Sequence, residues 1–117
     1  MKKKIAIIGS GVAGLVLGNL LKKSQSCDFM IYEKEDGLRF NEGYGIQLST
    51  NSISILNEID FDNIDEKQVF NPNKINFFSI KNKKICELDL SVFNRPDVKY
   101  TTLRRSTLVE FLKEKIY

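Results

Sequence analysis

The pattern of apolar and polar residues divides the start of the chain into three segments. Ile5–Ile8 is a short apolar run rich in β-branched residues and ends at Gly9, which predicts a strand buried on both faces. Apolar residues at helical spacing then predict a helix from about Val12 to Lys23, and Phe29–Tyr32 is a second short apolar run. Strand, helix and strand in this order predict a βαβ unit over residues 3–34.

The rest of the chain combines one hairpin pattern with two helical patterns. Residues 46–59 begin as a short strand and continue with a stripe of isoleucine and leucine that predicts a core-facing helix. Two alternating runs at about 73–91 predict an antiparallel hairpin with one buried face, which would form a second sheet inserted beside the parallel one. Residues 105–116 predict a returning amphipathic helix. Candidate N-cap residues of the two helices are Ser49 or Thr50 and Ser106.

The length of the chain sets its domain organisation. At 117 residues, 42% of them hydrophobic, the chain is long enough for one domain with a core. A crossover helix normally delivers the chain to another parallel strand, yet no strand follows residues 105–116. We therefore expect a single incomplete α/β domain over residues 1–117, the front end of a longer architecture that is either a truncated gene product or a fragment.

The turn between the first strand and the first helix carries the pattern G-x-G-x-x-G at Gly9, Gly11 and Gly14. In such a turn the first glycine allows a tight bend, the second lets the backbone approach a pyrophosphate, and the third lets helix and strand pack closely. The unpaired amides and the dipole at the start of the helix favour an anion there. The pattern therefore indicates a dinucleotide-binding turn.

Glu33 is the second part of this pattern, because it ends the second apolar run nineteen residues after Gly14. An acid at the tip of the second strand is where the ribose hydroxyls of an adenine dinucleotide are held. The alternative is a structural glycine-rich turn with an incidental Glu33. The polar loop Lys34–Gly45 follows, and Arg39 within it either reaches a phosphate or is simply solvated.

Composition argues against several other classes of protein. The 18 basic and 15 acidic residues nearly balance and are scattered, so nothing supports a nucleic-acid surface. The chain has no histidine and its two cysteines stand far apart, which argues against a zinc site or a histidine-based triad and fits reduced thiols in the cytoplasm. Ile5–Leu21 follows three lysines, but its glycines and the lack of a cleavage site argue against a membrane span or a secretory signal.

Two later segments narrow the family. Gly45–Asn51 reads G-I-x-L-x-x-N, and Arg105–Leu108 reads R-x-x-L at the start of the last helix. With the glycine turn and Glu33, they make the whole chain resemble the N-terminal part of FAD-dependent aromatic-ring monooxygenases of the para-hydroxybenzoate and salicylate hydroxylase type. The resemblance implies a Rossmann-like FAD-binding fold of the glutathione-reductase type, with the antiparallel hairpin inserted into it.

The same resemblance implies roles for individual residues. Glu33 would hold the adenosine ribose, and Lys34 and Arg39 would lie on the adenosine and pyrophosphate side. Arg105 would reach the flavin, although without the motif a surface role for Arg105 is the simpler interpretation. The residues implied at the pyrophosphate of FAD are Gly9, Ser10, Gly11, Val12, Ala13 and Gly14.

Complete members of the family use FAD, NAD(P)H and O₂ to hydroxylate a small aromatic substrate. The later family segments that contact the nicotinamide cofactor and the ribityl chain of the flavin are absent from this sequence, as is most of the substrate domain. We therefore expect the chain to be inactive alone. The alternatives are a non-catalytic fragment and another NAD- or FAD-binding oxidoreductase domain, because Glu33 suits NAD equally well.

Overall fold

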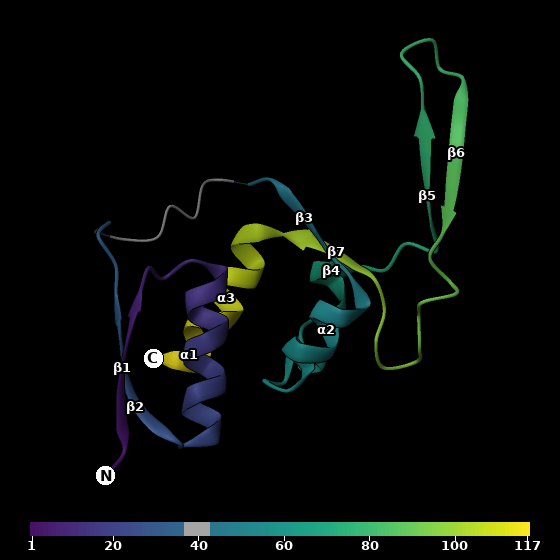
Figure 1. Cartoon of the computed structure of the whole chain (residues 1–117). Coiled ribbons are helices and arrows are strands. Elements are labelled where there is room, and N and C mark those ends of the chain that lie inside the picture. Colours follow the sequence, from purple (N-terminus) through teal and green to yellow (C-terminus); the bar gives the residue numbers. More distant parts are fainter. Residues whose placement is uncertain (37–42) are drawn as a thin grey trace.

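The computed structural model describes residues 1–36 and 43–117. A parallel pair of strands lies at one end, helices and a small sheet lie in the middle, and a hairpin projects at the other end (Figure 1). The helices are α1 (Val12–Ser24), α2 (Thr50–Asn57) and α3 (Arg105–Ile116), with single 3-10 turns at Phe61–Asn63 and Glu66–Gln68. The strands are β1 (Lys3–Ile8), β2 (Cys27–Tyr32), β3 (Gly45–Leu48), β4 (Val69–Phe70), β5 (Lys74–Phe78), β6 (Lys84–Asp89) and β7 (Thr101–Arg104).

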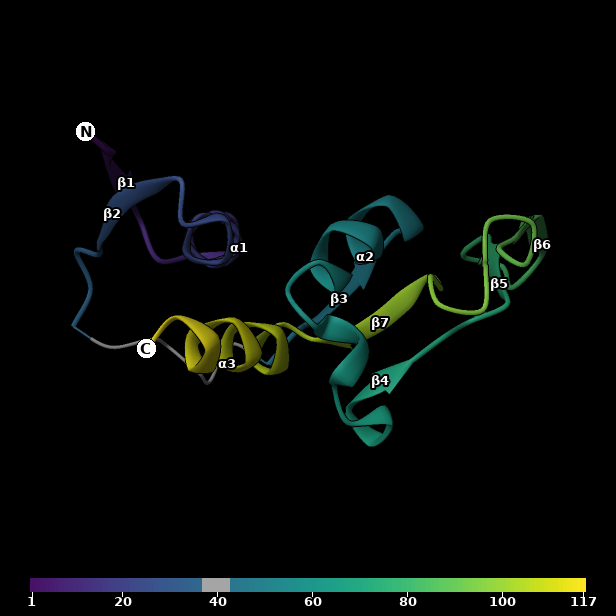
Figure 2. The ribbon, with the colours of Figure 1, turned by 90° about the horizontal axis from the view of Figure 1, so that it is seen from below.

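The strands β1 and β2 pair in parallel along their whole length, and α1 connects them across one face of the pair (Figures 1 and 2). The helix can approach the strands because Gly18 has no side chain. A Cβ atom built at Gly18 would stand 3.0 Å from Cδ1 of Ile31 in β2 and 2.4 Å from Cδ1 of Ile116 in α3. The first three elements therefore have the order and direction that a βαβ unit requires.

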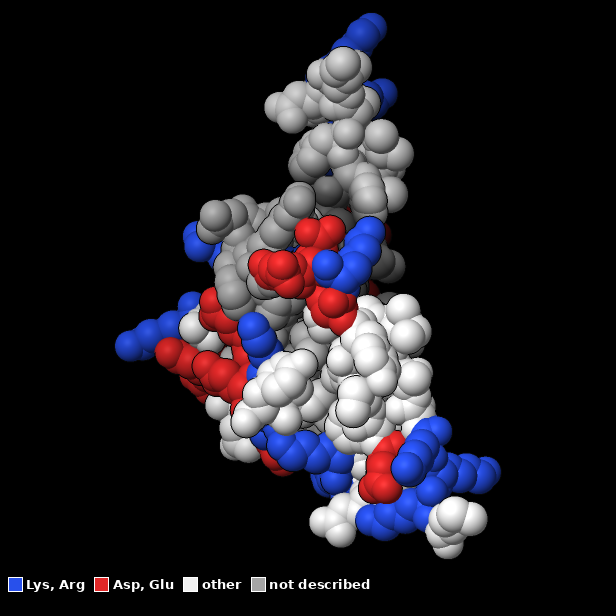
Figure 3. Space-filling model, turned by 90° about the vertical axis from the view of Figure 1, so that its left-hand side faces the viewer, with Lys and Arg blue, Asp and Glu red and all other residues white. Residues whose placement is uncertain are grey.

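The prediction of a first strand buried on both faces is wrong. In β1 only Ile7 is buried, while Ile8 is 82% exposed, and Met30 and Tyr32 of β2 are also more than half exposed. Figure 3 views the molecule from this side, where uncharged surface lies between groups of charged side chains. The physical reason is that α1 covers one face of the pair and no described element covers the other.

The core lies where α1 and α3 pack side by side (Figure 2). Leu15 of α1 and Leu108 and Leu112 of α3 are fully buried in one hydrophobic cluster. Asn19 is 5% exposed, and its Nδ2 donates to the carbonyl oxygens of Leu15 at 2.8 Å and Leu112 at 2.9 Å. One buried amide therefore joins the backbones of two helices that are distant in the sequence.

A second sheet is antiparallel, with the strand order β3–β7–β4, and lies beside α2 (Figure 1). The predicted core-facing stripe of α2 and the turn after it is confirmed, since Ile53, Leu56 and Ile59 are 4%, 4% and 3% exposed. The short strand predicted at the start of residues 46–59 is β3, but sequence periodicity does not predict the sheet as a whole, because its strands of 4, 2 and 4 residues are too short to show an alternating pattern. Its partners also lie far apart along the chain.

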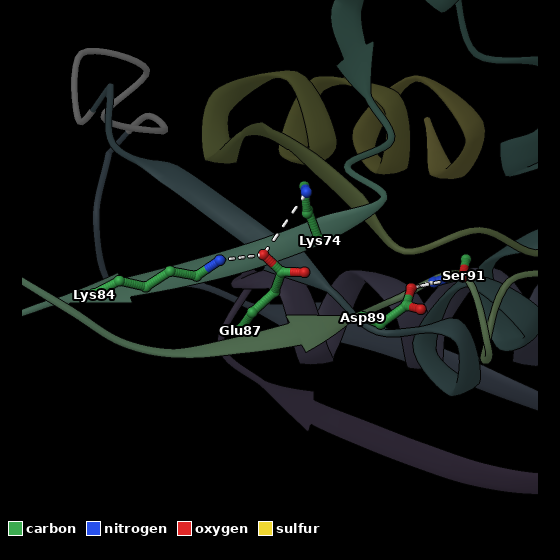
Figure 4. A network of polar contacts seen from close by, with 5 residues as sticks. All are labelled: Lys74, Lys84, Glu87, Asp89 and Ser91. Atoms are coloured by element: carbon green, nitrogen blue, oxygen red, sulfur yellow. Dashed lines mark hydrogen bonds and ion pairs between the residues drawn. The ribbon is translucent and has the colours of Figure 1, made fainter.

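The strands β5 and β6 form the predicted antiparallel hairpin, but the prediction of a buried face is wrong. Every residue of β6 is exposed, and Phe77 and Phe78 of β5 are 48% and 54% exposed. The hairpin projects away from the other elements in both ribbon views, so no described element packs on it. Its surface contacts are polar: Glu87 pairs with Lys84 at 2.5 Å and with Lys74 at 3.7 Å (Figure 4).

Neither predicted serine caps its helix through its side chain. Ser49 occupies the N-cap position of α2, but its hydroxyl bonds Oδ1 of Asn51 and makes no capping bond. At α3 the N-cap residue is Arg104, so the prediction for Ser106 is wrong. The helix follows β7 directly and leaves no turn residue to act as a cap.

The described chain is extended for its length. Its radius of gyration is 17.0 Å, whereas a compact domain of this size has about 13 Å. The difference reflects the elongated arrangement, in which the hairpin projects at the end opposite β1 and β2 (Figure 1). Within residues 1–36 and 43–117, no helix is long and apolar enough to cross a membrane.

Candidate functional site

The glycine turn joins β1 to α1 and is held against the end of β2. Gly9 has a φ of +98°, in the left-handed region where glycine is favoured. Its amide donates to the carbonyl oxygen of Tyr32, with an N···O distance of 2.7 Å. Because Glu33 comes directly after Tyr32, this bond brings the carboxylate to the turn.

The other two glycines of the turn differ in what surrounds them. A Cβ atom at Gly14 would lie 2.0 Å from the carbonyl oxygen of Gly9, so only glycine fits there without a backbone shift. A Cβ atom at Gly11 would meet no atom within 4 Å, and the φ of Gly11 is an ordinary −71°. Packing within the protein therefore explains Gly14, whereas Gly11 borders open space that a ligand can enter.

The first turn of α1 presents unpaired amides to that space. Gly11 is the N-cap residue, without a side-chain cap, and the first turn holds no acidic residue. The amide of Leu15 is the first to bond back, to the carbonyl oxygen of Gly11 at 2.9 Å. In the part of the chain that the structure describes, the amides of Val12, Ala13 and Gly14 have no acceptor. Amides and helix dipole together favour an anion at this point.

The Glu33 carboxylate lies on the turn. Its Oε2 accepts hydrogen bonds from the amide of Ser10 at 2.8 Å and from the Ser10 hydroxyl at 2.9 Å. Its Oε1 accepts one from the amide of Glu35 at 3.1 Å. The Ser10 amide, followed by the Glu35 amide and the Ser10 hydroxyl, lowers the pKa of Glu33 from 4.5 to about 2. An acceptor that is ionised at neutral pH therefore stands beside the free amides of α1.

The remaining predicted residues lie in three different places. Lys34 is exposed directly after Glu33, and Arg39 lies outside the described residues. Arg105 begins α3, where its amide donates to the carbonyl oxygen of Tyr44 at 3.1 Å and its guanidinium stands 5.9 Å from the centre of the Tyr44 ring. No local sequence pattern indicates Tyr44, because its ring contacts a residue that is far away along the chain.

Comparison with families of known proteins finds a match in the first part of the chain. A family model described as an NAD(P)-binding Rossmann-like domain matches residues 7–41, which include the glycine turn, α1, β2 and Glu33. A search of the curated proteins finds no significant match.

Comparison with solved structures extends the likeness to nearly the whole chain. The tetrameric form of 2-methyl-3-hydroxypyridine-5-carboxylic acid oxygenase has a TM-score of 0.77 and 22% identity, over 98% of this chain and 29% of that one. HpxO from Klebsiella pneumoniae, complexed with FAD and uric acid, has a TM-score of 0.73 and 18% identity, over 95% and 28%. The structure of 2,6-dihydroxypyridine-3-hydroxylase from Arthrobacter nicotinovorans has a TM-score of 0.67 and 14% identity, over 97% of this chain and 26% of that one.

The likeness covers the hairpin and the sheets as well as the βαβ unit. This chain spans less than a third of the length of these solved structures. The fold predicted from the sequence is therefore confirmed. The chain has an α/β architecture that corresponds to the N-terminal part of a Rossmann-like, glutathione-reductase-type FAD-binding fold with an inserted antiparallel hairpin.

Proposed function

We propose that this chain binds the adenosine diphosphate half of FAD, as the N-terminal FAD-binding portion of a flavin-dependent monooxygenase that hydroxylates a small aromatic substrate. The observation that carries the proposal is the contact of Glu33 with Ser10 beside the open space at Gly11. This arrangement puts an acceptor for ribose hydroxyls next to free amides for a pyrophosphate.

Each part of the site takes one part of the nucleotide. The turn shaped by Gly9 and the amides from Gly11 to Gly14 bind the pyrophosphate, since a side chain at Gly11 would fill the space that the phosphates need. Glu33 accepts the ribose hydroxyls, and its low pKa keeps it ionised at any physiological pH. Lys34 and Arg39 supply positive charge on the adenosine and pyrophosphate side.

We propose that Arg105 contacts the flavin end of the cofactor, as the family resemblance implies. Arg105 stands at the junction of β7 and α3, where its contact with Tyr44 restricts the guanidinium. When bound, FAD supplies the redox chemistry, with NAD(P)H as the electron donor and O₂ as the oxidant. Support for an aromatic substrate comes from the neighbours, which are an oxygenase of a hydroxypyridine carboxylic acid, a dihydroxypyridine hydroxylase and a protein complexed with uric acid.

Calorimetric titration with ADP and with FAD tests the nucleotide site. We expect both ligands to bind and to compete, and we expect Glu33→Gln to weaken both. Glu66→Gln, which removes an exposed carboxylate from a 3-10 turn elsewhere on the surface, is the matched control and should leave both affinities unchanged. Absence of ADP and FAD binding by the wild-type chain would reject the proposal.

We also propose that the 117-residue chain does not turn over alone, because it spans less than a third of the oxygenase-type structures that it resembles. NADH or NADPH oxidation in the presence of FAD and a panel of phenolic and pyridine carboxylic acids measures this. Sustained turnover would contradict it.

We place the protein in the cytoplasm, where its two free thiols, Cys27 and Cys86, stay reduced.

A second candidate is a nicotinamide dinucleotide site in another oxidoreductase. The matching family model, described as NAD(P)-binding, favours it, and Glu33 suits the ribose of NAD as well as that of FAD. Parallel titrations with NAD⁺ and FAD separate the two candidates. Binding of NAD⁺ without binding of FAD would make this second function the better one.

A further inference from the structure

We infer that Ser10 is a positioning residue, whose hydroxyl and amide together hold the Glu33 carboxylate in the orientation that accepts a ribose hydroxyl of the nucleotide. The inference rests on the proposed function and changes which residues of the turn contact the pyrophosphate. The family resemblance implies Ser10 as a pyrophosphate contact, whereas its donors already bond Glu33 in the structure. The pyrophosphate is then left with the amides that follow Ser10.

The geometry singles out one oxygen of the carboxylate. Both donors of Ser10 bond Oε2, at 2.8 Å from the amide and 2.9 Å from the hydroxyl, while the Glu35 amide bonds Oε1 at 3.1 Å. A carboxylate offers about four acceptor positions, so these three donors set its plane before a ligand arrives. A ligand hydroxyl then meets an acceptor that is already oriented.

The burial of the two residues explains why the hydroxyl matters. Ser10 is only 8% exposed and sits between two glycines, and the amide of Gly9 is bonded to the end of β2. Glu33 is exposed, and the terminal torsion of an exposed glutamate is broad when nothing restrains it. The hydrogen bonds from the buried serine therefore restrict the Glu33 side chain before a ligand binds. Without them the side chain would lose its conformational freedom during binding, and ordering it beforehand increases the affinity.

The alternative is that the Ser10 hydroxyl only fastens the turn to β2. The two roles predict different results with two nucleotides, ADP and 2′,3′-dideoxy-ADP, because only ADP carries the hydroxyls that Glu33 accepts. If Ser10 only holds the turn together, Ser10→Ala weakens both nucleotides by the same factor. If Ser10 positions Glu33, the loss falls on ADP and the preference for ADP over the dideoxy analogue shrinks.

The experiment is calorimetric titration of the 117-residue chain with both nucleotides. We expect Ser10→Ala to weaken the binding of ADP by about threefold to tenfold and to leave the affinity for 2′,3′-dideoxy-ADP unchanged. This loss is a part of the value of a hydrogen bond to a charged group. In a Glu33→Gln background the same substitution should have no further effect on ADP. Ser26→Ala, at an exposed serine before β2, is the control and should change neither affinity. Equal losses for both nucleotides, or no loss, overturn the inference.

A second measurement keeps the inference testable if the wild-type chain does not bind ADP, an outcome that rejects the proposed function. The pKa of Glu33, about 2 in the structure, can be followed by ¹³C NMR of its side-chain carboxyl carbon. Ser10→Ala should raise this pKa part of the way toward its ordinary value, because the amide bonds remain. An unchanged pKa would mean that the hydroxyl does not hold the carboxylate.

Discussion

Substituting alanine at Gly11 and at Gly14 separates what the fold requires from what a nucleotide requires. The two glycines belong to one motif and receive the same added methyl group. At Gly14 the new Cβ would lie 2.0 Å from the Gly9 carbonyl oxygen and 3.3 Å from Cγ2 of Ile7. At Gly11 it would meet nothing within 4 Å. We expect opposite outcomes in stability and in binding.

The magnitudes follow from these surroundings. In Gly14→Ala the helix gains about 1 kcal/mol of intrinsic propensity, but the obstructing atom belongs to the backbone, so the turn or the helix has to shift. Such overpacking costs about 1–3 kcal/mol, so we expect a net loss of up to about 2 kcal/mol. In Gly11→Ala the weaker N-cap costs about 0.5–1 kcal/mol, and a similar gain from the less flexible unfolded chain offsets it.

Urea unfolding followed by circular dichroism and calorimetric titration with ADP measure the two effects. We expect Gly11→Ala to unfold within about 1 kcal/mol of the wild type and to bind ADP at least tenfold more weakly, because the methyl group enters the pyrophosphate space. Normal ADP binding by Gly11→Ala would refute the reasoning, since the open space would then not be the phosphate site. Severe unfolding of Gly11→Ala would refute it too, because the glycine would then be structural.

Three further predictions concern the core, the pH dependence and the hairpin. Asn19→Ala removes two buried hydrogen bonds, one within α1 to Leu15 and one to Leu112 of α3, and should cost about 2 kcal/mol in urea unfolding; an unchanged midpoint would mean that the bonds contribute nothing. The pKa of Glu33 is lowered in the folded state, so its stabilising effect is complete above its unfolded value of 4.5 and disappears as the pH falls to about 2. Thermal unfolding of Glu33→Gln should therefore vary less with pH across this window than that of the wild type, and equal slopes would contradict the assignment. Phe77→Ala on the exposed hairpin should cost about 1 kcal/mol or less, whereas Leu108→Ala in the core should cost about 2–5 kcal/mol; equal losses would show that the hairpin is packed in solution.

Local spacing explains why the sequence predicted the first part of the site. Gly9, Gly14 and Glu33 lie within one βαβ unit, where the parallel pairing of two consecutive strands leaves little freedom in how their ends meet. The positions of the glycines and the acid along the chain therefore determine that the turn and the carboxylate meet. The same holds for the hairpin pairing, because a short connection joins its strands.

The tertiary structure alone decided which apolar surfaces are buried by other elements and which hydrogen-bond donors contact Glu33. Apolar periodicity predicts that a face can be buried but does not say what buries it, so the outer face of β1 and the face of the hairpin were predicted wrongly. The contact of Asn19 with Leu112 joins segments with no shared local pattern. Which donors Ser10 offers to Glu33 is likewise decided by the three-dimensional turn. Residue order thus determined this protein's glycine turn and its βαβ unit, while long-range packing determined the exposure of its surfaces and the orientation of the Glu33 carboxylate.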